Sequence, residues 1–228
     1  TRVVTVVLGV TASAAATGWV LGAAVATLSG SATPAWVVAR AAGLASYLLL
    51  VALVCLGLVL AHPWRARLSW PSAPVRLRAH VSLAVFTLAF VVLHVVVLAT
   101  DAWAGVGWAG ALLPMGSDYR PVPVTLGVIG LWAGLLAGLT AALAGRVAGR
   151  LWWPVHKVAV ASLVLVWLHS LLAGSDAATL TGFYAVTGLG VLALAVSRYV
   201  ARTPAEVAAG TDTAPPEAAA GRARAGRR

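Results

Sequence analysis

Charged residues are scarce in this sequence. Asp, Glu, Lys and Arg make up 10% of its 228 residues, whereas 61% are hydrophobic, and the mean hydropathy is +0.94. Soluble globular domains carry about 25% charged residues, so this composition excludes that class. It also leaves few polar side chains to line a solute path, which counts against a transporter. The sequence therefore predicts a protein that lies mostly in lipid.

Cysteine is nearly absent as well. The single Cys55 falls within an apolar run, so the chain can build neither a disulfide framework nor a thiolate metal site. A length of 228 residues leaves no room for a second catalytic domain of ordinary size beside membrane helices. We therefore expect any soluble chemistry to come from a partner.

Long apolar runs fill most of the chain. Each can cross a bilayer as a helix, which takes about 20 residues, and breaks containing Pro, Gly or Arg separate the runs. The sequence predicts an all-α bundle of six transmembrane helices at about 3–28, 36–61, 79–100, 122–145, 151–173 and 180–199. These form one membrane domain, 1–202, and a disordered basic tail follows at 203–228. The first run resembles a cleavable signal peptide, but it continues to Leu28, so we expect it to be retained.

The basic residues act as topology signals. The formal net charge is +10, but the cations lie in short loops and the tail, not on a polar face, which argues against nucleic acid. One end of the bundle is expected to carry Arg2, Arg65, Arg67, Arg76, Arg78, Arg146, Arg150, Arg198 and Arg202, and the other Asp101, Asp118 and Asp176. The positive-inside rule then places both termini in the cytoplasm of a bacterial inner membrane.

Four of the five histidines lie within predicted membrane helices, where ionisable side chains are costly and tend to be functional. His80 and His94 are 14 residues apart on the third helix, and His156 and His169 are 13 apart on the fifth. These spacings span about 21 and 20 Å along a helix axis. Because the two helices run in the same direction, we expect His80 to face His156 near the inner surface. His94 then faces His169 nearer the outer surface.

Each level thus offers two neutral imidazoles, which can bind a haem iron from above and below. A zinc site would need three or four ligands at one level. We predict two b-type haems, with these four histidines as the metal ligands. The alternative is that each histidine only hydrogen-bonds a backbone carbonyl of a neighbouring helix. One geometric tension is that His156 and His169 point about 140° apart on a straight helix. His62 has no partner at its depth, and we expect it to be interfacial.

These motifs resemble the ferric-reductase-like transmembrane family, which includes NADPH oxidases and metal reductases. The resemblance covers about 36–199 and rests on both histidine spacings, on Trp153 to His156-Lys157, and on Arg40-Ala41-Ala42-Gly43. It implies that Arg40 reaches an outer-haem propionate and that Arg76, Arg78 and Lys157 can pair with inner propionates. The presence of His80 favours the two-haem pattern of the oxidases. Their flavin and nicotinamide domain is missing from the sequence, so a separate flavoprotein is the expected donor.

The expected function is electron transfer across the membrane through two haems. A cytoplasmic reductant supplies electrons, and the acceptor on the exterior face is a ferric chelate, oxygen, a quinone or a redox protein. The chain would then be the membrane haem subunit of an oxidoreductase. Two alternatives stay open: a di-haem cytochrome fed by quinol within the membrane, and a non-redox transporter or scaffold with core histidines.

Overall fold

The computed structural model describes residues 33–143 and 152–201, which form helices joined by turns, with no strand among them. The long helices are α2 (Pro34–Ala61), α3 (Ala73–Thr100), α5 (Pro121–Ala142), α7 (Val158–Ala173) and α8 (Thr181–Val200); the short helix α6 (Trp152–His156) precedes α7. Five spans in this part of the chain are long and apolar enough to cross a membrane, the fourth being Pro154–Ala173. These residues therefore belong to a multi-pass helical membrane protein. The predicted first helix, 3–28, and the tail, 203–228, lie outside the described residues, so the count of six stays a prediction.

Prolines determine where the long helices start and stop. Pro34, Pro74 and Pro121 lie in the first turns of α2, α3 and α5, where the missing N–H removes no helical hydrogen bond. Pro63 favours an extended conformation in the residue before it, and His62 ends α2 with φ −68° and ψ 138°. α3 starts at Ala73 and not at 79, because its charged first turns resemble a loop in hydropathy.

Two short helices were not predicted. The stretch after α3, expected to be a loop, contains α4 (Gly107–Leu112), and the α2–α3 connection contains the 3-10 helix η1 (Pro63–Arg67). Both are too short for a hydrophobic period to show. Gly107 has φ +62°, in the left-handed region that favours glycine, and Trp132 Nε1 donates to the Leu112 carbonyl over 3.0 Å at the other end of α4.

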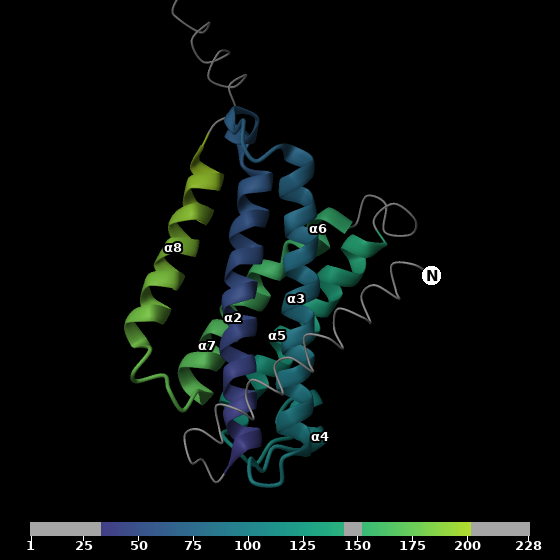
Figure 1. Ribbon diagram of the computed structural model, residues 1–228, viewed down its shortest axis with the longest axis vertical. Coiled ribbons are helices and arrows are strands. Elements are labelled where there is room, and N and C mark those ends of the chain that lie inside the picture. The colour runs from purple at the N-terminus through teal and green to yellow at the C-terminus, as the bar shows by residue number, and fades with distance from the viewer. Residues whose placement is uncertain (1–32, 144–151, 202–228) are drawn as a thin grey trace, which may run out of the picture.

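The long helices pack as two antiparallel pairs, α2 with α3 and α5 with α7, and α8 lies against α2 (Figure 1). Ala39 and Ala42 of α2 and Ala89 of α3 are almost fully buried, and such small side chains let helices approach closely. Tyr47 is 1% exposed and shares a 2.6 Å hydrogen bond with Thr187, which ties α8 to α2. α3 and α7 are hardly in contact, so space remains between the two pairs.

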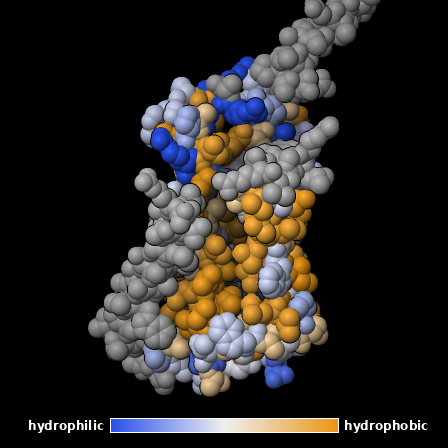
Figure 2. All heavy atoms as spheres, turned by 90° about the vertical axis from the view of Figure 1, so that its right-hand side faces the viewer, coloured by the Kyte–Doolittle hydropathy of each residue, from blue (hydrophilic) through white to orange (hydrophobic). Residues whose placement is uncertain are grey.

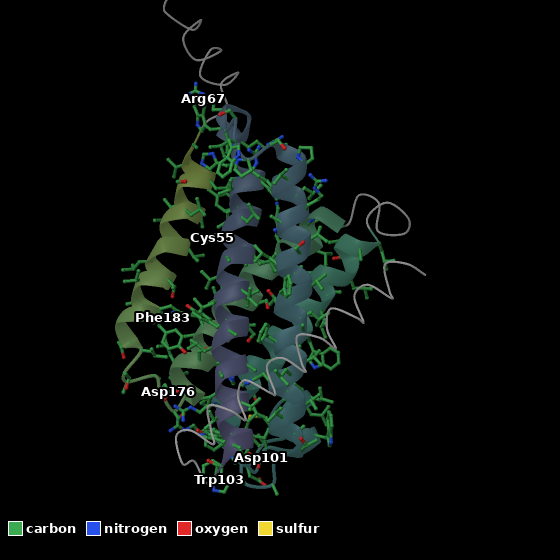
Figure 3. All side chains as sticks on the ribbon, viewed as in Figure 1. Cys55, Arg67, Asp101, Trp103, Asp176 and Phe183 are labelled. Atoms are coloured by element: carbon green, nitrogen blue, oxygen red, sulfur yellow. The ribbon has the colours of Figure 1, made fainter. Side chains whose placement is uncertain are left out.

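The two ends of the bundle differ in charge, as the sequence predicts. Arg67 lies at one end, and Asp101 and Asp176 lie toward the other (Figure 3). On the face drawn in Figure 2, hydrophobic surface fills the middle, and strongly hydrophilic residues gather toward the end of the bundle that carries Arg67. The charge separation is therefore a feature of the fold. Which end faces the cytoplasm belongs to the proposal below.

Candidate functional site

A large cavity lies between the two helix pairs. Its volume is about 1350 Å³, and α2, α3, α5, α6, α7 and α8 all contribute to its mainly apolar wall. Figure 2 shows the hydrophobic surface hollowed near mid-height. A pocket for one drug-sized ligand measures roughly 300–1,000 Å³, so this cavity has room for more. His80, His94, His156 and His169 all line it.

His80 and His156 form one pair across this cavity. Their ring centroids are 6.2 Å apart, and the ring planes meet at 71°. Two imidazoles that bind one metal ion from opposite sides have centroids about 6 Å apart, because each metal–nitrogen bond is about 2 Å and each ring adds about 1.2 Å. The separation therefore suits a bis-histidine site.

His94 and His169 form the second pair, on the same cavity and close enough to interact electrostatically. His94 lies 14 residues from His80 on the 28-residue α3, half the helix away, and both fall within one uninterrupted α-helix. The two pairs thus occupy different depths. In the part of the chain that the structure describes, no three His, Cys, Asp or Glu side chains gather at one point, so the pairs suit a planar haem better than tetrahedral zinc.

Backbone carbonyls fix the orientation of three of the four rings. His94 Nδ1 lies 2.7 Å from the Ala39 oxygen, His169 Nδ1 lies 2.9 Å from that of Pro123, and His156 Nδ1 lies 3.2 Å from that of Ala137. A carbonyl oxygen can only accept, so Nδ1 carries the proton and donates in each case. Nε2 then keeps a lone pair, which is the usual arrangement of a metal-binding histidine.

These hydrogen bonds are also what the alternative interpretation of satisfied core histidines predicts. That interpretation accounts for one nitrogen of each ring. It does not account for the pairing of His80 and His156, whose ring centroids lie 6.2 Å apart, nor for the position of all four imidazoles on the wall of one cavity. The arrangement therefore favours a ligand between the rings.

A turn at Lys157, which keeps α-helical backbone angles (φ −62°, ψ −19°), lies within the 13-residue spacing of His156 and His169. α6 ends at His156, Lys157 is a turn, and α7 begins at Val158. His156 and His169 thus lie on either side of a local irregularity, so the 100° rotation per residue of one straight helix applies only approximately between them. The sequence offered Pro154 as the only local signal of an interruption.

The basic residues of the predicted site divide into two groups. Arg40 and Lys157 line the cavity, whereas Arg76 and Arg78 are not among its lining residues. Arg76 is only 6% exposed, and its guanidinium donates to the carbonyl oxygens of Arg65, Leu68 and Pro71. It therefore holds the α2–α3 connection in shape. Arg78 is exposed.

Arg40 binds a carboxylate at the cavity wall. Its Nε donates to Asp176 Oδ2 over 2.8 Å, and its Nη2 pairs with Asp176 Oδ1. This two-point geometry is the one by which arginine recognises carboxylates in general. Sequence reasoning missed two other wall residues, Asp176 itself and Arg198 at the end of α8, because it assigned both to the ends of the bundle.

His62 is not among the lining residues of the cavity, and its predicted interfacial position stays a prediction. Its Nδ1 accepts from the Trp64 N–H over 3.2 Å, and its Nε2 lies 3.4 Å from the Ser197 hydroxyl. It thus joins the end of α2 to the end of α8. This is a structural role.

The geometry defines a class: a helical membrane protein with two histidine pairs across an internal cavity. No protein-family model matches the sequence, and neither the curated proteins nor the solved structures give a match. The resemblance to the ferric-reductase-like family therefore continues to rest on the motifs given above.

Proposed function

We propose that this chain is a membrane cytochrome that moves electrons between the two faces of a bilayer. It would hold two b-type haems, one between His80 and His156 and one between His94 and His169. The observation that carries the proposal is the pairing of four imidazoles across one apolar cavity, three of them with Nδ1 committed to a backbone carbonyl. A bound haem supplies a one-electron redox centre.

The residues of the chain meet the other requirements of such a centre. Neutral imidazoles ligate without bringing net charge into the lipid. The apolar wall excludes water and so helps to set the redox potential. At one end Arg40, paired with Asp176, would bring its positive charge close to a propionate carboxylate. At the other end Lys157 and Arg198 both line the wall, and either cation could pair with a propionate of the second haem.

We further propose that the end carrying Arg65 and Arg67 faces the cytoplasm of a bacterial cell, as the positive-inside rule requires. The His80–His156 level lies toward this end, so it would receive the electron. The α2–α3 connection presents two arginines and Trp70, which is 85% exposed, the side-chain types enriched at binding hot spots. An acidic flavoprotein is the donor that fits this surface. The acceptor at the other face would be a ferric chelate, oxygen, a quinone or a redox protein.

Haem content tests the proposal directly. Pyridine haemochrome analysis of the purified full chain should give two haems per chain, and a reduced-minus-oxidised spectrum should show b-type bands. A folded chain without haem would support the non-redox scaffold instead. Full reduction by a quinol alone, with no cytoplasmic donor, would support the quinol-linked alternative.

A further inference from the structure

Three glycines lie where three of the cavity imidazoles meet a neighbouring helix. A Cβ built on Gly43 would lie 2.9 Å from the Cε1 and Nδ1 atoms of His94. On Gly127 it would lie 2.7 Å from His169 Nδ1, and on Gly57 it would lie 3.2 Å from His80 Cε1. We propose that Gly43, Gly57 and Gly127 are positioning residues for the histidine ligands, an inference that rests on the function proposed above.

Helix geometry explains why glycine is needed at these positions. Every Cα–Cβ bond in an α-helix tilts toward the N-terminus, so the side chain of residue i+4 overhangs the carbonyl of residue i. Gly43 follows Ala39 by four residues, and Gly127 follows Pro123 by four. Without a Cβ overhead, each carbonyl stays open to a second donor from the next helix. That donor is the Nδ1–H of His94 or His169.

The fourth histidine provides an internal comparison. His156 donates to the Ala137 carbonyl, and the residue four positions later is Ala141. With this methyl group in place the Nδ1–oxygen distance is 3.2 Å, against 2.7 and 2.9 Å where glycine stands. The Ala137 carbonyl also accepts from the Thr140 hydroxyl over 3.1 Å. The longer hydrogen bond thus coincides with both a Cβ overhead and a second donor.

His80 follows the pattern in its packing and departs from it in its hydrogen bonding. Gly57 follows Leu53 by four residues, and the Leu53 carbonyl lies near His80 Nδ1 but does not meet hydrogen-bond geometry among the described residues. Here the glycine provides room for the ring. Gly43 and Gly57 are 14 residues apart on α2, the spacing of His94 and His80 on the antiparallel α3, so each level has its own glycine.

A methyl group at these positions should therefore act on one haem level at a time. At Gly43 and Gly127 it would push the imidazole off its carbonyl, and a histidine that loses this hydrogen bond becomes a less basic ligand. At Gly57 it would displace the His80 ring itself. A less basic ligand stabilises ferric iron less, which raises the midpoint potential. Alanine in place of glycine otherwise favours a helix, so weakened helices would not explain a loss.

The test uses the full-length, haem-loaded chain in its membrane, with Gly43→Ala, Gly127→Ala and Gly57→Ala. Redox titration and the electron paramagnetic resonance of low-spin haem measure each level separately. Although they lie on different helices, Gly43→Ala and Gly127→Ala should both change the component that His94→Leu removes, by loss or by a raised potential. Gly57→Ala should change the component that His80→Leu removes. The matched controls Gly182→Ala and Gly190→Ala, where a Cβ would meet nothing within 4 Å and which are not among the lining residues of the cavity, should leave both components unchanged.

One further variant should shift the midpoint potential in the opposite direction, and it removes a methyl group, so it introduces no steric clash. Ala141→Gly opens the Ala137 carbonyl to His156 and should lower the potential of the His80–His156 component with no loss of haem. Glycine variants that behave like the controls, or that weaken both components equally, would overturn the positioning role, as would an unchanged potential in Ala141→Gly. Failure of the proposed function looks different, because the unsubstituted chain itself would then bind no haem.

Discussion

Arg40 and Asp176 form a two-point ion pair at the end of the cavity that holds His94 and His169. The two side chains are 40% and 43% exposed, and such pairs contribute at most about 1 kcal/mol to stability. Arg40 and Asp176 should have a larger effect on the electrostatic potential at the His94–His169 level, because they place a fixed cation and a fixed anion beside the cavity.

We predict opposite shifts in midpoint potential from the two partners. Arg40→Ala removes a positive charge that favours the reduced centre, so the potential of the His94–His169 component should fall. Asp176→Asn removes a negative charge, so the same potential should rise. Redox titration at low ionic strength measures both. Shifts of the same sign would show that Arg40 and Asp176 act through packing and not through charge.

Single histidine substitutions should separate the two levels. His94→Leu should remove one redox component and His80→Leu the other, because each variant deletes a ligand at a different depth of the cavity. His62→Leu, outside the cavity wall, is the control and should keep both components. Loss of the same component in the His80 and His94 variants would contradict the pairing.

Arg76→Ala should destabilise the α2–α3 connection. The variant loses a buried guanidinium and leaves the carbonyl oxygens of Arg65, Leu68 and Pro71 without this donor, a change worth roughly 2–4 kcal/mol. Limited proteolysis in the 62–72 segment should accelerate. Arg76→Lys should not restore protection, because a single ammonium cannot reproduce the planar fork.

The exposed Arg78 provides the matched control for that experiment. Arg78→Ala removes the same charge from the same helix and should change stability by less than about 0.5 kcal/mol. Equal protease sensitivity in the two variants would mean that net charge, and not the carbonyl contacts of Arg76, holds the segment.

The proposed orientation of the chain in the membrane can be tested by labelling with a thiol reagent. In a Cys55→Ala background, Ser69→Cys should react with an impermeant thiol reagent from the cytoplasm and Asp118→Cys from the exterior, since both positions are exposed. In oriented vesicles, an impermeant reductant on the Ser69 side should reduce the His80–His156 component first. Reduction of the other component first would show that either the topology or the assignment of levels is wrong.

Association with an acidic donor should depend on salt. Arg65→Ala and Arg67→Ala should each slow reduction by the donor protein, and the difference from the unsubstituted chain should shrink as ionic strength rises. Arg120→Ala, at the opposite end, is the control. Equal rates in all these proteins at low salt would exclude the α2–α3 connection as the docking surface.

Hydropathy alone predicted the membrane helices within the described residues because burial in lipid leaves a long, unambiguous signal. The starts and ends agree to within about two residues for α2 and α8, whereas α5 ends three residues early, at Ala142, and the predicted helix 151–173 is divided into α6 and α7. At α3, Arg76 and Arg78 lie in a helix that extends beyond the apolar core. α4 and η1 left no such signal, since a helix of five or six residues shows no period.

The sequence predicts which histidines pair, but it does not predict the hydrogen bonds and glycine contacts that orient their rings. The depths of His80 and His156 follow from counting residues along helices, and their contact across the cavity was expected. Which backbone carbonyls contact the rings depends on how adjacent helices are rotated about their axes. No local sequence pattern specifies that rotation. The 14-residue spacing of Gly43 and Gly57, equal to that of His80 and His94, is a sequence signal for these supports. It does not by itself predict them, because glycine in a membrane helix usually indicates close helix packing alone.

Because α3 and α7 are hardly in contact, few direct contacts hold the two helix pairs together. Each helix pair can insert as a hairpin, but the pairs meet chiefly where α2 contacts α7 and α8 and where α4 joins α3 to α5. If the cavity holds two haems, each would bridge the pairs through one histidine from either side, and binding of this kind stabilises the assembled form by mass action. A cell short of haem would then accumulate hairpins that membrane proteases can remove, so haem supply would set the amount of this protein in the membrane.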